Sequence, residues 1–381
     1  MFNDLTRREF VALAGASVAG GMLPDLCAAN PGPTAPPHTL TLIEGSPRER
    51  GRMYGRKFAQ PIRDFLEREI YKPFATDTAK RNEITRYAGA CLNIVEKWSP
   101  EITEELHGVA EASDVSVVEL VLMSLHEELY HRGDIPKIEH CTAVAVGPPN
   151  SATGDTYVGQ TWDWMGSVFG MSEMLHWKRS EGPSLLSYAY PGLWVGAGMN
   201  SAGLALCWTS ASDETSRGPR VGVPSYLLIT QMMYQETLDA AVEEARRAPH
   251  AGWFTFVMGD GEGNLLNVEG SPKELAVEKH TGTLARVDYG SRQMTRTADG
   301  QDVQYTPRCR KMYELLRQTK GKIATGDLRN YFLTPEHEIY NPGMTIDAFI
   351  FNTTKRKLEI TRGLGSSGEW QTFEFPKETA K

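Results

Sequence analysis

The sequence has few cysteines, no long hydrophobic run and no block of like charges. Five cysteines occur among 381 residues, without a Cys-x-x-Cys pair or other metal or redox spacing, and they are too few for a disulfide framework. The net charge of -8 comes from 40 basic and 48 acidic residues mixed along the chain, which leaves no basic footprint for nucleic acid or an anionic membrane. A small molecule or short peptide is therefore the expected partner of this globular chain.

Residues 1–29 are expected to form a twin-arginine export signal. Arg7 and Arg8 precede a short, glycine-rich and weakly apolar run over residues 11–23. About 13 such residues are too few for a membrane anchor, because a spanning helix needs roughly 20. Cleavage after Ala29 would leave a proline-rich linker over residues 30–40 and a periplasmic or secreted protein.

Residues 41–140 are predicted to be mainly helical. Capping boxes at Ser46 with Glu49 and at Ser116 with Glu119 predict two helix starts, and the first leads into an amphipathic stretch towards Ile70. A third helix is predicted to begin after Ser99, which is followed by proline.

The pattern changes from helices to strands at Cys141. Residues 142–146 and 157–164 have strand composition and flank a turn-rich segment, so they predict a β-hairpin that brings Asp163 back towards Cys141. Further hairpins are predicted for residues 194–199 with 204–208, 254–258 with 265–269, and 348–351 with 358–361, with helices over 225–234 and 238–247. This alternation predicts a layered α+β architecture.

The segment around Cys141 resembles a known motif. Cys141 and Thr142 are followed by a short strand, a turn and the sequence Gly-Gln-Thr-Trp-Asp at residues 159–163. This is similar to the Cys-Thr and Gly-Gln-Asn-Trp-Asp pattern of the penicillin acyltransferase-like branch of the N-terminal-nucleophile (Ntn) hydrolases, whose prototype is acyl-CoA:6-aminopenicillanic acid acyltransferase. Weaker similarity extends over nearly all of the chain beyond the linker. The resemblance implies the four-layer αββα sandwich of the Ntn-hydrolase fold with a helical N-terminal segment.

The resemblance also implies a precursor that cuts itself before Cys141, with the thiol attacking the carbonyl of His140. The freed α-amine has an ordinary pKa of about 7.7 to 8.0 and a thiol one of about 8.5, so proton transfer between them near neutral pH is nearly thermoneutral. One residue would thus supply nucleophile and base for cleavage of an amide through a thioester, without a metal or organic cofactor. The fragment before Cys141 would stay bound to the chain 141–381 as a heterodimer.

Further site residues follow from the same resemblance. Asp163 is expected to orient the α-amine or thiol of Cys141, and Asp288 is a candidate catalytic residue. Thr161, Trp164 and Thr209 are candidate substrate-binding residues. Thr161, Thr209 and Asp288 stand where relatives commonly have asparagines; because an ionised aspartate cannot donate a hydrogen bond to an oxyanion, backbone N–H groups or another side chain must do so. The family's late arginine has no clear counterpart, since residues 339–341 occupy its approximate position.

Two alternative functions remain open. The chain could be a non-catalytic binding homologue, or a conventional cysteine hydrolase that uses His140 or another histidine as base; both predict an intact chain. His126 and His131 are five residues apart rather than the four of a zinc-protease helix, so no metal site is expected there. Export favours hydrolysis over coenzyme A-dependent transfer, because the thioester is an intracellular metabolite.

Overall fold

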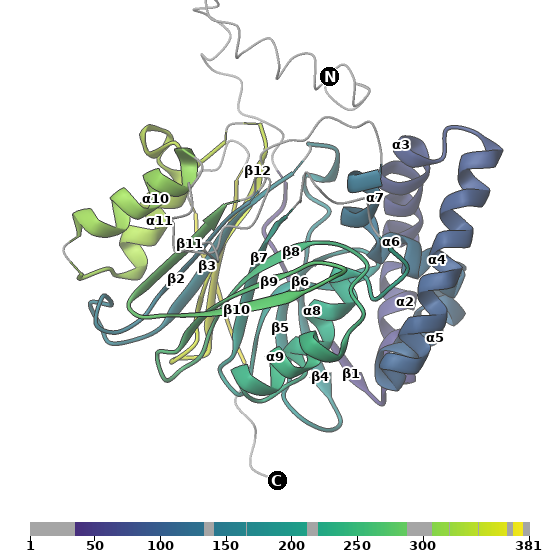
Figure 1. Ribbon diagram of the computed structural model, residues 1–381, viewed down its shortest axis with the longest axis horizontal. Coiled ribbons are helices and arrows are strands. Elements are labelled where there is room, and N and C mark those ends of the chain that lie inside the picture. Colours follow the sequence, from purple (N-terminus) through teal and green to yellow (C-terminus); the bar gives the residue numbers. More distant parts are fainter. Residues whose placement is uncertain are drawn as a thin grey trace, which may run out of the picture.

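Two β-sheets lie face to face in the middle of the molecule, and helices cover the outer face of each (Figure 1). The computed structural model describes residues 35–132, 141–164, 166–211, 220–287, 307–319, 321–341, 343–363 and 369–375. Its layers confirm the predicted four-layer αββα sandwich.

Within the described residues, sheet A has eight strands, which are antiparallel to their neighbours apart from the parallel pair β1 and β4. In order across the sheet they are β1 (Leu40–Gly45), β4 (Glu173–Arg179), β5 (Leu185–Tyr190), β6 (Leu193–Asn200), β7 (Ala205–Ser210), β8 (Phe254–Gly259), β9 (Leu265–Gly270) and β10 (Leu275–His280). Strands β6 and β7 pair only beside their turn, as far as Gly198 and Leu206. Beyond that pair β6 and β7 no longer pair, and the N–H of Trp208 donates to the side chain of Gln160 on β3 instead.

Sheet B has six antiparallel strands in the part of the chain that the structure describes. In order they are β11 (Thr283–Val287), β2 (Thr142–Val146), β3 (Tyr157–Asp163), β12 (Thr345–Asn352), β13 (Lys357–Arg362) and β14 (Gln371–Glu374). Thr142 lies opposite Thr161 and Ala143 lies opposite Gln160. Because side chains alternate along strands, the row with Ala143 belongs to the core between the sheets, whereas Val144 belongs to the core under the outer helices.

The helices lie in two layers, one on each outer face. On the sheet A side they are α2 (Pro47–Phe65) with the π-helix η1 (Leu66–Tyr71), α3 (Lys72–Phe74), α4 (Thr78–Trp98), α5 (Pro100–Ser113), α6 (Val117–Ser124), α7 (His126–Arg132), α8 (Ser225–Met233) and α9 (Leu238–Arg247). On the sheet B side they are α10 (Pro307–Gln318) and α11 (Thr325–Leu333). Both predicted capping boxes are present, with the side chains of Glu49 and Glu119 accepting from Ser46 and Ser116.

Glycines let helices α2 and α5 approach each other closely. A Cβ atom on Gly51 would lie 2.2 Å from the carbonyl oxygen of Glu105, and one on Gly108 would lie 2.2 Å from that of Arg48. Neither position accepts a side chain without moving the helices apart. The contact is reinforced by the buried Arg50, whose guanidinium bonds Glu105 at 2.5 Å and Glu101 at 2.7 Å.

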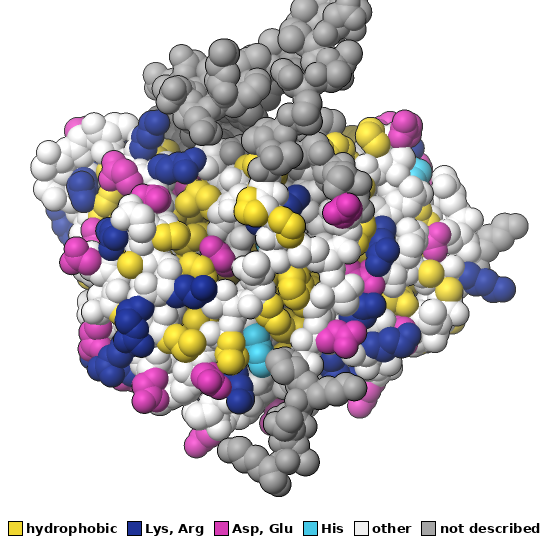
Figure 2. Space-filling model, turned by 180° about the vertical axis from the view of Figure 1, so that it is seen from behind, with side chains coloured by type: hydrophobic (Ala, Val, Ile, Leu, Met, Phe, Trp, Pro, Cys, Tyr) yellow, Lys and Arg dark blue, Asp and Glu magenta, His cyan; other side chains and the backbone are white. Residues whose placement is uncertain are grey.

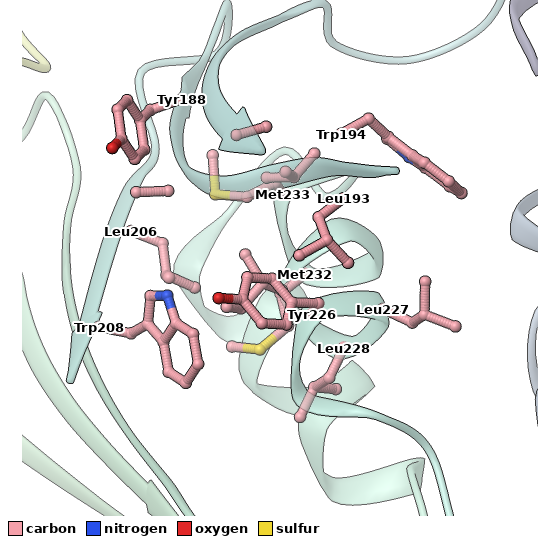
Figure 3. Packing of buried hydrophobic residues seen from close by; sticks show 14 of the residues in the cluster. Tyr188, Leu193, Trp194, Leu206, Trp208, Tyr226, Leu227, Leu228, Met232 and Met233 are labelled. Carbon is pink, nitrogen blue, oxygen red and sulfur yellow. The ribbon is translucent and has the colours of Figure 1, made fainter. Parts of the chain in front are cut away.

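The core between sheet A and α8 is largely aromatic and aliphatic (Figure 3). Trp208 of β7 and Tyr226 of α8 lie edge to face, with 5.1 Å between ring centroids. Both side chains are buried. This packing fixes β7 along the segment where β6 no longer pairs with it.

Several elements were not predicted from the sequence. They include β1, β4, β5, β10, β11, β14, α10 and α11. Strand β1 begins at Leu40, which the sequence analysis placed in the linker, and His38 before it is already buried. The predicted hairpins and the helices at residues 225–234 and 238–247 are confirmed.

The described surface shows mixed charge. On the face seen in Figure 2, Lys and Arg side chains alternate with Asp and Glu and do not gather into one field. Among the described helices, none combines the length and apolarity needed to cross a bilayer.

Candidate active site

Cys141 lies directly before β2, with its thiol on the face of sheet B that meets sheet A. The residue is 6% exposed. Its Sγ donates a long hydrogen bond to the backbone carbonyl oxygen of Asp163, 4.0 Å away. Burial raises the pKa of this thiol far above its ordinary value, and the charge of Asp163 adds to the shift. In the uncut chain the thiol is therefore protonated. His140 lies outside the described residues.

The Asp163 carboxylate is fully buried at the end of β3 and accepts two hydrogen bonds. Arg308 Nη1 donates to Oδ2 at 2.7 Å, and Thr345 Oγ1 donates to Oδ1 at 2.8 Å. Burial raises the pKa of Asp163, while Arg308 and Thr345 oppose that shift by stabilising the charged form. The carboxylate is thus held by two donors beside the backbone that Cys141 contacts.

Arg308 was missed by the sequence analysis. It stands in the first turn of α10, far from residues 339–341 where the family's late arginine was sought. The structure brings its guanidinium to Asp163 across 145 positions of sequence. Nothing in the local pattern distinguishes Arg308 from the neighbouring basic residues of α10, so only the tertiary fold identifies it.

Gln160 shares the inner face of sheet B with Cys141 and was also not singled out. Its side chain is fully buried, and Oε1 accepts the backbone N–H of Trp208 at 2.9 Å across the two sheets. Nε2 is buried and makes no hydrogen bond of ordinary length within the described part of the chain. The amide of Gln160 favours the thiolate of Cys141 and opposes the rise of the thiol pKa.

The predicted substrate-binding residues occupy three different places. Thr161 is fully buried, and its Oγ1 accepts the backbone N–H of Thr142 at 3.2 Å, which ties the start of β2 to β3. Trp164 packs against the rings of His126 and Tyr130, with centroids 4.9 and 5.1 Å away. Thr209 is buried on β7, and its hydroxyl has no partner in the described part of the chain. Their contact with substrate remains a prediction.

Asp288 lies outside the described residues. Strand β11, which leads to it, ends at Val287, and Val287 pairs with Thr142 next to Cys141. The catalytic role of Asp288 therefore stays a prediction.

Helix α7 contributes a second buried carboxyl group to this region. Glu127 Oε2 accepts from Ser210 Oγ at 2.7 Å, next to Thr209 on β7. Burial raises the pKa of Glu127 to about 7, and the hydrogen bond from Ser210 only partly offsets this. Glu128 beside it accepts from the backbone N–H and hydroxyl of Ser225 at the start of α8.

The described residues hold no group of three or more His, Cys, Asp or Glu side chains arranged for a metal ion. His126 and His131 instead lie against aromatic rings, those of Trp164 and Trp253 among them.

Comparison with known proteins places this geometry in a class. The model of the family described as "Acyl-coenzyme A:6-aminopenicillanic acid acyl-transferase" matches residues 150–366, more than half of the chain. With the αββα sandwich, the match defines an Ntn-type acyltransferase or amidohydrolase. The chain belongs to the acyl-coenzyme A:6-aminopenicillanic acid acyl-transferase family. The matched region includes Asp163, Thr209 and Arg308 and begins after Cys141.

Solved structures show more distant similarity. A variant of the conjugated bile acid hydrolase from Clostridium perfringens is 14% identical, covers 63% of this chain and 93% of its own, and has a TM-score of 0.43. The penicillin V acylase from Agrobacterium tumefaciens is 12% identical, covers 62% of this chain and 86% of its own, and has a TM-score of 0.41. Because these identities and TM-scores are low, the family assignment rests on the match to the family model over residues 150–366.

Proposed function

We propose that the chain is an exported amidohydrolase that cuts itself before Cys141 and then uses the freed cysteine as nucleophile. The observation that carries the proposal is the position of Cys141 at the start of a central strand, with its thiol at the carbonyl of Asp163. The carboxylate of Asp163, held by Arg308, is suited to stabilise a positive charge nearby, such as the α-ammonium that cleavage would create. A high thiol pKa in the uncut chain fits a precursor that gains its base only on cleavage.

The proposed reaction has two steps. The α-amine takes the thiol proton, Sγ forms a bond to the substrate carbonyl carbon, and the carbonyl oxygen takes the displaced electron pair. The oxyanion then collapses, the C–N bond breaks, and the amine leaves with the proton from the α-ammonium. In the second step the α-amine takes a proton from water, and the resulting hydroxide attacks the thioester carbonyl. The intermediate then collapses, the C–S bond breaks, the acid leaves, and the α-ammonium returns its proton to the sulfur.

The fragment before Cys141 is proposed to remain bound after cleavage. Strand β1 is built into sheet A beside β4, and the buried Glu105 of α5 accepts from Tyr234 at 2.7 Å. Glu101 of the same helix pairs with Arg179 of β4 at 2.7 Å. Loss of the fragment would make β4 an edge strand and deprive Arg179 and the Tyr234 hydroxyl of these carboxylate partners, so the two chains are expected to copurify.

Activity assays with the purified full-length chain test the function. N-acyl amides should be hydrolysed. If the reaction is stopped early with a denaturant, an acyl group should be found on Cys141 by mass spectrometry, and hydroxylamine should release it. Cys141→Ala should abolish both signals, whereas Cys91→Ala, a buried cysteine of α4, should retain them. Absence of turnover and of an adduct on any amide or acyl-coenzyme A would favour the binding homologue.

Hydrolysis and acyl transfer are separated in the same assay. Acyl-coenzyme A with 6-aminopenicillanic acid as acceptor is compared with the simple amides at equal concentrations. Export by the predicted signal favours water as acceptor, and faster reaction from the thioester would reverse that preference.

A further inference from the structure

The side-chain amide of Gln160 bridges the two sheets with only one of its two ends occupied. Its carbonyl oxygen accepts from Trp208 N at 2.9 Å, and its buried NH₂ group makes no hydrogen bond of ordinary length among the described residues. Leaving a buried donor unpaired is unfavourable, and most buried polar groups in proteins are paired. The position therefore requires an explanation beyond packing.

The backbone of β7 sets the orientation of this amide. Since β6 has separated from β7 beyond Leu206, the N–H of Trp208 is free to donate to Gln160 Oε1. That bond distinguishes the two ends of the amide, because exchanging them would place NH₂ against an N–H donor. The NH₂ group is thus turned away from Trp208 by a fixed backbone contact.

Strand geometry places this donor on the same side of sheet B as the Cys141 thiol. Gln160 is opposite Ala143, and Cys141 precedes Ala143 by two residues, so the side chains of all three point to sheet A. Thr142, Thr161 and Asp163 alternate with them, and the Asp163 carboxylate reaches α10 on the other side. The thiol and the amide donor therefore face the same space between the sheets.

We propose that Gln160 Nε2 donates a hydrogen bond to the carbonyl oxygen that Cys141 attacks and holds it while it becomes the oxyanion. The inference rests on the proposed amide chemistry. As Sγ bonds to the carbonyl carbon, the electron pair of the C=O π bond moves to the oxygen, and the N–H of Gln160 stabilises that charge without transferring its proton. The amide of Gln160 would thus supply the hydrogen-bond donor that an asparagine could supply at the positions of Thr161, Thr209 or Asp288.

Two substitutions separate this role from packing. Gln160→Glu keeps an oxygen for Trp208 N–H and removes the donor, whereas Gln160→Met keeps the volume without adding charge. Each is made in a full-length chain that an added protease can cut just before Cys141, so the free cysteine forms even if self-cleavage fails. Asn267→Leu is the matched control, because Asn267 of β9 is another buried amide with an unpaired atom.

Acylation and alkylation of Cys141 are then measured side by side. Single-turnover acylation by an N-acyl amide forms an oxyanion, but alkylation by iodoacetamide at saturating pH does not. Both Gln160 variants should lose about 10²–10³-fold in acylation, and Gln160→Met should keep its alkylation rate within about threefold. The control should keep both rates within about threefold.

The outcomes are distinguishable. If the wild type acylates and Gln160→Met acylates at a similar rate, the role of Gln160 is wrong and the proposed function stands. If acylation and alkylation fall together, Gln160 positions the thiol and the oxyanion role is wrong.

If the wild type itself reacts with no amide, the proposed function is wrong, and this result is separate from the role of Gln160. Should Gln160→Met not fold, Gln160→Glu decides by its acylation rate after correction for the thiol pKa measured by alkylation.

Discussion

Arg308 donates a 2.7 Å hydrogen bond to the buried carboxylate of Asp163, and this ion pair joins the first turn of α10 to the strand end beside Cys141. The bond links the outer helical layer on the sheet B side directly to the site. Because the carboxylate is fully buried, its charge depends on this partner more than a surface carboxylate would.

Removal of Arg308 should leave a buried charge uncompensated. Arg308→Met is expected to lower the free energy of unfolding by about 3–5 kcal/mol and to abolish most activity. Asp163→Asn in the same background should restore part of that stability, since no buried charge then remains. A double-mutant cycle by urea denaturation should give a coupling of about 0.5–3 kcal/mol, and additive effects would show that the pair does not interact.

Thr345 should set the lower pH limit of activity through Asp163. Its hydroxyl donates to Oδ1 and lowers the pKa of a carboxyl that burial raises. In Thr345→Val the pKa of Asp163 rises further, so the acid limb of kcat/KM should move to higher pH. Thr345→Ser keeps the donor and should follow the wild-type profile. An unshifted limb in the valine variant would separate Asp163 ionisation from catalysis.

His38, which lies just before β1, should make stability depend on pH. Its ring contacts Ser172 Oγ at 3.1 Å, and burial is the main cause that lowers its pKa from 6.5 to about 4, partly opposed by Asp347. The folded state therefore binds this proton less readily than the unfolded state. Stability from this group is full above pH 6.5 and falls by about 3 kcal/mol as the pH drops to about 4.

The measurement is urea denaturation of the wild type and His38→Gln between pH 4 and 7. The stability difference between them should shrink as the pH falls, whereas His107→Gln on α5 serves as the matched control and should track the wild type. A pH-independent difference between wild type and His38→Gln would contradict the assignment.

Glu127 should have the opposite dependence. Its pKa in the folded chain is raised from 4.5 to about 7, so the folded state binds the proton more tightly and stability falls as the pH rises through that range. Glu127→Gln keeps an acceptor for Ser210 and removes the charge. It should be up to about 3 kcal/mol more stable than the wild type at pH 8.5 and nearly equal at pH 4.5, by urea denaturation. Equal stability at both pH values would show that Glu127 ionises freely.

Local patterns predicted much of the fold. Capping boxes at Ser46 and Ser116 and the hairpin from Thr142 to Asp163 depend on residues close in sequence, and they formed as predicted. The parallel pairing of β1 with β4 was not predictable in this way, because it joins segments separated by α2 to α7. Strands buried on both faces, such as β5, also lack the alternation that identifies a half-buried strand.

The residues of the candidate site also fall into two groups, those that the sequence located and those that only the structure identified. The resemblance located Cys141 and Asp163, and the structure brings the thiol to the backbone of Asp163. Arg308 and the orientation of Gln160 depend on α10 and β7, which meet sheet B only in the folded chain. Sequence patterns identify the reacting residue, whereas the groups that set its charge environment come from distant elements.

The central claim is tested most directly by intact mass spectrometry of the purified wild type and of Cys141→Ala. The account predicts two chains in the wild type, one of them beginning at Cys141 and holding 381 − 140 = 241 residues, and a single uncut chain in the variant. The two wild-type fragments should elute together under native conditions. One intact chain in both proteins would contradict self-activation and leave a conventional cysteine hydrolase or a binding homologue.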